Sequence, residues 1–309
     1  MTFQALRDKV FQSHASHRYA KAIELVESHW DDLSDRRGEL AYWLVCLYSI
    51  VGRLDDAFAV IDSTMREGAM LPPTMLMSDP DLEAFREDGR YPKLIERLAL
   101  VHEARIHEAR PAIEFALPSD APTFDTAALL LHGNNSNGQE ALYQWRVILP
   151  ASWLLVAVTS REPSQREGGH LWSDANARAS TLKSTLPLFQ STARDSSIVV
   201  VGFSLGCTAA LEAITFMAKP IDLVILAAPS VNAERLRRYD SYGLIRRLLV
   251  FTGESDPTAI EVADLATDLA ASGGTKATTL VFDHLGHEYP PPEQAANAVH
   301  QILTEESSL

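Results

Sequence analysis

The chain has 309 residues, 46% of them hydrophobic and 22% charged, a composition that suits about two globular domains with buried cores. Its formal net charge of −14 argues against nucleic acid and anionic membrane surfaces as partners. The cysteines, Cys46 and Cys207, form no disulfide framework and have no zinc-site spacing, so neither a metal nor another cofactor is expected.

The first ten residues lack the apolar core of a signal peptide, and no stretch is long and apolar enough to span a membrane. Together with the few cysteines, this predicts a soluble protein of the cytoplasm. Residues 1–109 then predict a small all-α domain, because apolar side chains recur at helical spacing, as at Tyr19, Ala22 and Val26.

A repeat is visible within this helical part. Residues 17–28 align with residues 52–63 at an offset of 35, and Gly52 stands where two helices would turn. The period is close to the roughly 34 residues of tetratricopeptide helix pairs, which the segment resembles. About two units are present, fewer than such arrays usually need to be stable alone. The resemblance therefore leaves several roles open: packing on the rest of the chain, pairing in a homodimer, or binding a protein partner.

From residue 110 to residue 309 the pattern changes to strands that alternate with helices, which predicts a mostly parallel α/β sheet flanked by helices. The first strand, near Ala112, is expected to be an antiparallel edge strand. Five buried strands should follow at residues 127–131, 153–158, 198–201, 223–227 and 248–251, with a last one at 278–282. Helices are expected at residues 174–192 and 259–271, and another should follow the strand at 198–201. A last helix should begin at Pro291, and a helical connection should join the strands at 223–227 and 248–251.

One stretch carries the clearest chemical signal. The apolar run Ile198–Val201 leads into Gly202–Gly206, a Gly-x-Ser-x-Gly pattern, and then into a helix. A serine on such a strand-to-helix turn takes a strained backbone, and the helix N-terminus favours negative charge beside it. This pattern resembles the nucleophile elbow of the α/β-hydrolase family, with Ser204 as nucleophile. The alternative is a glycine-rich turn whose serine only caps the helix.

The resemblance extends to other strand ends and implies roles for the residues there. His132-Gly133-Asn134 follows the strand at 127–131 and resembles the family's His-Gly signature, so the backbone N–H groups of Asn134 and Leu205 would form the oxyanion hole. His132 itself is expected to fix the loop. Asn135 is a candidate substrate contact.

The acid and the base are expected after the last two strands. Asp256 in Gly253–Pro257 matches the family's Gly-x-x-Asp pattern, and His287 after Gly286 matches its Gly-His. Along the chain, Ser204, Asp256 and His287 come in the order nucleophile, acid and base, which is the order in the family that the sequence resembles. Asp256 could instead be a plain helix cap, and Glu254, Asp283 and His284 are rivals.

Residues 161–172 are rich in glycine, serine and charge and are expected to form a mobile rim, where Trp172 is a candidate substrate contact. The resemblance implies a serine hydrolase that cleaves small-molecule carboxylic esters through a Ser-His-Asp triad, without a cofactor. A peptidase of the same fold is the alternative. A non-catalytic protein that recruits a partner through its helices is another.

Overall fold

The computed structural model describes residues 1–118, 123–231, 237 and 244–304. The chain divides into two compact units. We call Met1–Ala109 together with Pro163–Gly169 the helical unit, and Arg110–Glu162 together with His170–Leu309 the sheet unit. Each is described by itself below. No helix within the described residues is long and apolar enough to cross a membrane.

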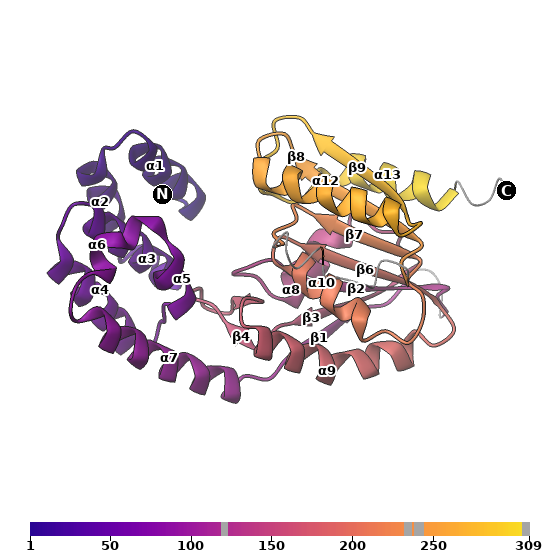
Figure 1. The fold of residues 1–309 in the computed structure, drawn as a ribbon, viewed down its shortest axis with the longest axis horizontal. Coiled ribbons are helices and arrows are strands. Elements are labelled where there is room, and N and C mark those ends of the chain that lie inside the picture. Colours follow the sequence, from indigo (N-terminus) through magenta and orange to yellow (C-terminus); the bar gives the residue numbers. More distant parts are fainter. Residues whose placement is uncertain (119–122, 232–236, 238–243, 305–309) are drawn as a thin grey trace. The chain divides into compact units, whose positions relative to one another are not determined.

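The helical unit is built from α-helices and two 3₁₀ turns (Figure 1). In chain order these are α1 (Phe3–Ala15), α2 (Tyr19–Glu27), η1 (Ser34–Arg36), α3 (Arg37–Ile50), α4 (Leu54–Arg66), α5 (Pro73–Ser78), η2 (Pro80–Leu82), α6 (Glu83–Arg86) and α7 (Tyr91–Glu108). They share one apolar core, to which each of the long helices contributes. Since α3 is buried around most of its circumference, it forms the centre of this unit.

The sequence repeat corresponds to a repeat in backbone geometry. His17 and Gly52, at equivalent positions in the turns before α2 and α4, have φ of 54° and 74°. The next residue in each turn donates its N–H back to the preceding helix at 2.8 Å. A third segment, at the start of α7, matches in burial but not in backbone geometry. Leu94 and Leu98 are buried at the positions that Ala22 and Val26 occupy in α2, whereas Gly89 does not have a positive φ. The assignment to the tetratricopeptide class remains a prediction.

The sheet unit contains a seven-stranded sheet in the order β1-β3-β2-β6-β7-β8-β9. Its strands are β1 (Ala112–Ala116), β2 (Thr126–Leu131), β3 (Leu154–Thr159), β6 (Ser197–Phe203), β7 (Leu223–Ala227), β8 (Arg247–Gly253) and β9 (Lys276–Phe282). Strand β1 pairs with β3 antiparallel, and every other neighbour pair is parallel. Both the mostly parallel sheet and the antiparallel first strand are thus confirmed. β2, β3 and β7 are apolar along nearly their whole length because helices cover both faces of the sheet.

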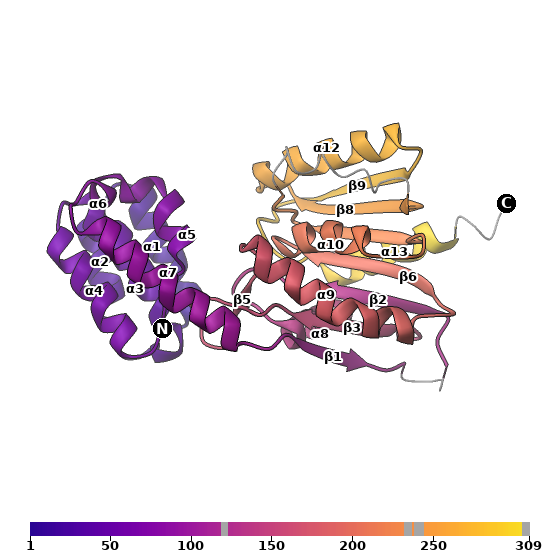
Figure 2. The same ribbon diagram turned by 60° about the horizontal axis from the view of Figure 1, so that its bottom comes forward.

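Helices α9 (Ala175–Thr192), α10 (Gly206–Thr215) and α12 (Pro257–Ser272) pack on one face, and α8 (Gly138–Trp145) and α13 (Pro292–Thr304) pack on the other (Figure 2). The sequence did not predict α8, whose N-terminus is capped by the side chain of Asn137. The predicted connection between residues 227 and 248 falls largely outside the described residues.

Residues 161–172, expected to form a rim, contain two short strands that the sequence did not predict. Strands β4 (Glu162–Pro163) and β5 (His170–Leu171) pair as a two-stranded ladder. Residues 163–169, from the second residue of β4 to the residue before β5, are called the strap, and they pack with the helices of the helical unit. A Cβ atom on Gly38 of α3 would lie 2.0 Å from the carbonyl oxygen of Gln165, so only glycine lets the helix and the strap backbone approach this closely.

Candidate active site

Ser204 lies on the tight turn between β6 and α10, at the edge where the parallel strands end. Its φ of 54° is in the left-handed region, which is strained for a side chain other than glycine. The turn is held on both sides: the Ser204 N–H donates to the carbonyl of Ala227 at 2.9 Å, and the Ser204 carbonyl accepts from the N–H groups of Cys207 at 3.0 Å and Ser230 at 3.2 Å. These bonds can offset the strain and fix the serine at one position.

The two glycines of the turn are required by close packing. A Cβ on Gly202 would lie 2.7 Å from Cα of Cys207, and a Cβ on Gly206 would lie 2.3 Å from the carbonyl oxygen of His132. Each of these contacts is to backbone, which cannot swing away as a flexible side chain would. The Gly-x-Ser-x-Gly pattern therefore reflects space as well as conformation.

Three side chains from separate strand ends form a hydrogen-bonded chain. The carboxylate of Asp256 accepts a hydrogen bond from Nδ1 of His287, with Oδ2 and Nδ1 2.6 Å apart. Because Nδ1 then carries the proton, Nε2 is free to accept from the hydroxyl of Ser204, at 2.7 Å. Asp256 and Ser204 are buried, whereas the side chain of His287 is 45% exposed. The arrangement can therefore move a proton from a buried hydroxyl to an imidazole that solvent reaches.

The loops after β8 and β9 are joined directly, which explains how Asp256 meets His287. Main-chain N–H groups of Glu254 and Ser255 donate to carbonyls of the β9 end and its loop, both at 2.9 Å. A Cβ on Gly253 would lie 2.1 Å from the carbonyl oxygen of Leu285, so the crossing also depends on a glycine. The other oxygen of Asp256 caps helix α12 by accepting from the Ala259 N–H at 3.1 Å. The carboxylate is thus both a cap and a partner of the imidazole.

The rival residues lie apart from this chain of hydrogen bonds. Glu254 accepts from the main-chain N–H of His284 at 3.1 Å, and its carboxylate lies 3.7 Å from the His284 ring nitrogen Nδ1. Both side chains are exposed, as is Asp283. Cys207, close to the serine in sequence, is a buried thiol whose pKa is raised by burial, so it is a poor nucleophile.

Two backbone N–H groups remain as candidates for an oxyanion hole. Neither the N–H of Asn134 nor that of Leu205 has a hydrogen-bond acceptor among the residues that the structure describes. Leu205 immediately precedes helix α10, whose N-terminus favours negative charge. Asn134 is exposed in the loop after β2. Asn135, the candidate substrate contact beside it, is half-buried with a φ of 58°.

His132 holds the loop that carries Asn134. Its Nε2 accepts from the Ser160 N–H at 3.1 Å, and its Nδ1–H donates to the Gly133 carbonyl at 2.6 Å. Burial lowers the pKa of His132 to about 3, so the ring is neutral and suited to these two roles. It is not positioned as a base for the serine, in agreement with its expected structural role.

Trp172 does not face a substrate site. Its side chain is fully buried in the core beneath α9 and α10, and its indole N–H donates to the carbonyl of His132 at 2.9 Å. The indole therefore supports the same loop from inside, and we do not retain Trp172 as a substrate contact. Sequence spacing gave no sign of this bond, which joins residues 40 positions apart.

An aromatic pair that the sequence did not single out lies next to the imidazole. The ring of Phe203 stacks on Tyr289, with centroids 3.8 Å apart, and lies 5.9 Å from the ring of His287. This pair gives the histidine an apolar neighbour. Within the described ranges, no group of three or more His, Cys, Asp and Glu side chains is arranged to hold a metal ion.

The comparisons with known proteins bear on the fold. No family model and no curated protein matches the sequence. Among solved structures, an uncharacterized protein from Bacillus cereus is similar over 99% of both chains, at 18% identity and a TM-score of 0.51. Esterase PE8 is similar over 62% of this chain and 99% of its own (20% identity, TM-score 0.47). A carboxylesterase from Mesorhizobium loti is similar over 59% of this chain and 90% of its own (18% identity, TM-score 0.44).

These likenesses concern architecture. The strand order, the single antiparallel edge strand β1 and the serine on the turn after β6 define the α/β-hydrolase fold, and this chain has that fold.

Proposed function

We propose that the protein is a serine hydrolase that cleaves carboxylic ester bonds through an acyl-enzyme intermediate. The observation that carries this proposal is the unbroken hydrogen-bonded chain from Ser204 through His287 to Asp256. A serine hydroxyl alone is a weak nucleophile, and an imidazole with a fixed tautomer is the group that activates it.

In the proposed reaction, Nε2 of His287 takes the proton of the Ser204 hydroxyl as the oxygen attacks the ester carbonyl. The carbonyl oxygen becomes an oxyanion, and the N–H groups of Leu205 and Asn134 stabilise it. His287 then gives its proton to the departing alkoxide, which leaves as the alcohol, and the acyl group stays on Ser204. In the second half, His287 takes a proton from water as its oxygen attacks the acyl carbonyl, and then returns a proton to the departing Ser204 oxygen, so that the carboxylic acid is released and the free serine is restored.

Asp256 acts on the imidazole and not on the substrate. Its carboxylate holds the proton on Nδ1 and stabilises the imidazolium that forms during attack. Asn135, at the entrance of the oxyanion loop, is proposed to contact the substrate. No cofactor takes part in these steps.

Covalent labelling tests the proposal. A fluorophosphonate probe should label the full-length protein and not the Ser204→Ala variant, while Ser184→Ala, which removes a hydroxyl elsewhere in the sheet unit, should label as the wild type does. Labelling that persists in Ser204→Ala would refute Ser204 as nucleophile. The absence of labelling in the wild type would favour a non-catalytic, partner-recruiting protein.

The substrate class is tested separately. Purified protein should hydrolyse a panel of p-nitrophenyl esters of increasing acyl length, and should leave short blocked peptides intact. Peptide cleavage that exceeds ester cleavage would instead assign a peptidase.

We further propose two domains, a helical one at residues 1–109 and a hydrolase one at residues 110–309, with the strap donated by the second to the first. We place the protein in the cytoplasm because Cys46 and Cys207 are buried free thiols.

A further inference from the structure

The helical unit contains a cavity of its own, of about 310 Å³, which involves none of the residues of the triad. Helices α1 and α3 form its walls, and the turn η2 with the residue before it closes one end. Its volume is at the lower end of the range for ligand pockets, so it suits a single side chain or a small molecule.

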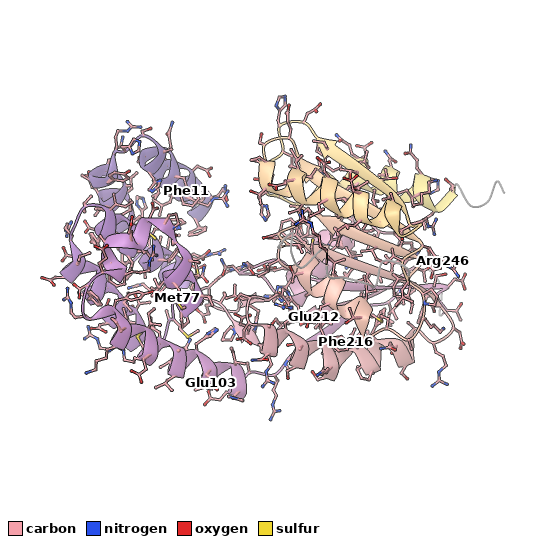
Figure 3. The ribbon with its side chains drawn as sticks, viewed as in Figure 1. Phe11, Met77, Glu103, Glu212, Phe216 and Arg246 are labelled. Carbon is pink, nitrogen blue, oxygen red and sulfur yellow. The ribbon has the colours of Figure 1, made fainter. Side chains whose placement is uncertain are left out.

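Most of the cavity is apolar and aromatic. Val10 and Leu47 are buried in its wall, and Trp43 adds an indole. Phe11 also lines it, yet the residue is 53% exposed and projects from α1 (Figure 3). This exposed phenyl ring continues the apolar lining of the cavity onto the surface.

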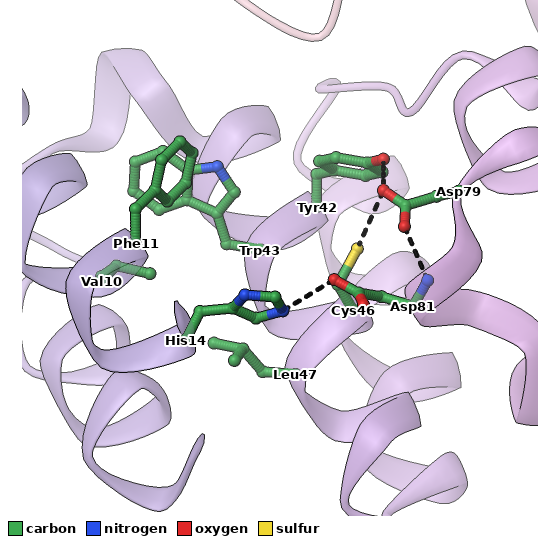
Figure 4. A pocket seen from close by; sticks show the side chains of 9 residues that line it. All are labelled: Val10, Phe11, His14, Tyr42, Trp43, Cys46, Leu47, Asp79 and Asp81. Atoms are coloured by element: carbon green, nitrogen blue, oxygen red, sulfur yellow. Dashed lines mark hydrogen bonds and ion pairs between the residues drawn. The ribbon is translucent and has the colours of Figure 1, made fainter. Parts of the chain in front are cut away.

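The polar end of the cavity is acidic (Figure 4). Asp79 accepts hydrogen bonds from the hydroxyl of Tyr42 and, at 3.8 Å, from the thiol of Cys46. Asp81 accepts from Nε2 of His14 at 2.9 Å. The two carboxylates are joined by the Asp81 N–H, which donates to Asp79 at 2.8 Å.

The negative charge of this end is only partly balanced. Burial raises the pKa of both Tyr42 and Cys46, so these groups stay neutral and act as donors. Arg86 reaches the main-chain carbonyl of Asp79, at 2.6 Å, and not its carboxylate. Within the part of the chain that the structure describes, neither carboxylate forms an ion pair with a lysine or an arginine.

We infer that this cavity binds the side chain of a lysine or arginine presented by a peptide segment of a partner protein. The long apolar stem of such a side chain matches the walls, and its charged head reaches the carboxylates of Asp79 and Asp81. Phe11 at the mouth contacts apolar residues that flank the bound side chain.

Matched probes separate the parts of this proposal. The peptides Ac-Leu-Lys-Leu-NH₂ and Ac-Leu-Nle-Leu-NH₂ differ only in the ammonium group, because norleucine keeps the apolar stem. Titration of each into the full-length protein, followed by saturation-transfer NMR, should give binding of the lysine peptide and at least about fivefold weaker binding of the norleucine peptide. Equal binding of the two peptides would overturn the proposal. n-Butylammonium, a free amine with no peptide backbone, is the third probe. If this amine binds but the lysine peptide does not, the proposal that the partner is a peptide is wrong.

Variants of the cavity provide the second test. Asp81→Asn should weaken the lysine peptide by about fivefold, whereas Asp31→Asn, which removes an exposed carboxylate outside the cavity, should not. Phe11→Ala should weaken the tripeptide more than it weakens n-butylammonium. Circular dichroism checks that each variant is folded. Equal affinities for wild type, Asp81→Asn and Asp31→Asn would refute the assignment of the cation to the acidic end.

Discussion

Replacing Asp256 by asparagine tests the proposed mechanism most sharply, because it separates the two roles of the carboxylate. An asparagine side chain caps helices about as well as aspartate, so the bond to the Ala259 N–H and the stability of α12 should be retained. The bond of 2.6 Å to Nδ1 of His287 is different. An amide that turns its NH₂ group toward the ring leaves the proton on Nε2, and that nitrogen can then no longer accept from Ser204.

The expected loss in kcat is about 10⁴, the size found when the same change is made in a well-studied serine protease triad. This corresponds to about 5.5 kcal/mol of transition-state stabilisation. The assay is hydrolysis of a p-nitrophenyl ester at saturating concentration, with the thermal midpoint measured on the same samples. Glu254→Gln and Asp283→Asn are the controls, since both carboxylates are exposed and neither bonds to His287. A kcat for Asp256→Asn within a few-fold of wild type, with a collapse in either control, would refute Asp256 as the acid.

Three further predictions concern packing, pH and the division of the chain. Gly206→Ala should destabilise the fold by about 1–3 kcal/mol and abolish ester hydrolysis, because the new Cβ would lie 2.3 Å from a carbonyl oxygen. Gly89→Ala is the control, since the space around its Cβ is open, and it should change neither stability nor activity. Equal effects of the two changes would contradict the packing argument. Burial lowers the pKa of His132 to about 3 from 6.5, so the unfolded chain binds a proton below about pH 6.5 that the folded chain rejects. Between about pH 6.5 and about pH 5, the unfolding free energy of the wild type should therefore fall by about 2 kcal/mol more than that of His132→Gln. Urea titration at each pH measures both. Equal losses in the two proteins would count against a buried neutral ring. Deletion of residues 1–109 should expose the strap and lower the thermal midpoint, and an unchanged midpoint with full activity would show that the helices are a detachable arm.

The strands were predictable because their signal is local. Apolar runs such as the one before Ser204 are typical of strands buried on both faces, and their alternation with helices is enough to predict a parallel sheet. The carboxyl ends of parallel strands meet at one edge, which is why residues as far apart in sequence as Asp256 and His287 could be expected to lie together. Their catalytic role remains a prediction.

The elements that sequence reasoning missed depend on distant contacts. The glycine- and serine-rich composition of residues 161–172 predicts a loop, but β4 and β5 pair within it, and its residue Gln165 packs against α3. Trp172 is buried because its indole N–H finds a carbonyl 40 residues earlier, which no periodicity reveals. Helix α8 is eight residues long, and its capping residue, Asn137, lies in a stretch that also suits a loop.

The strap has a consequence for how the chain folds during synthesis. Residues 1–109 leave the ribosome before the strap, yet the backbone of α3 at Gly38 packs closely against Gln165, which follows β1, β2 and β3. At common rates of translation this interval lasts on the order of seconds. The nascent helices must wait through that time with an uncovered backbone, and they are completed only when part of the sheet unit has been made. The two units are therefore not independent products of one chain, because the first can be finished only after the second has begun.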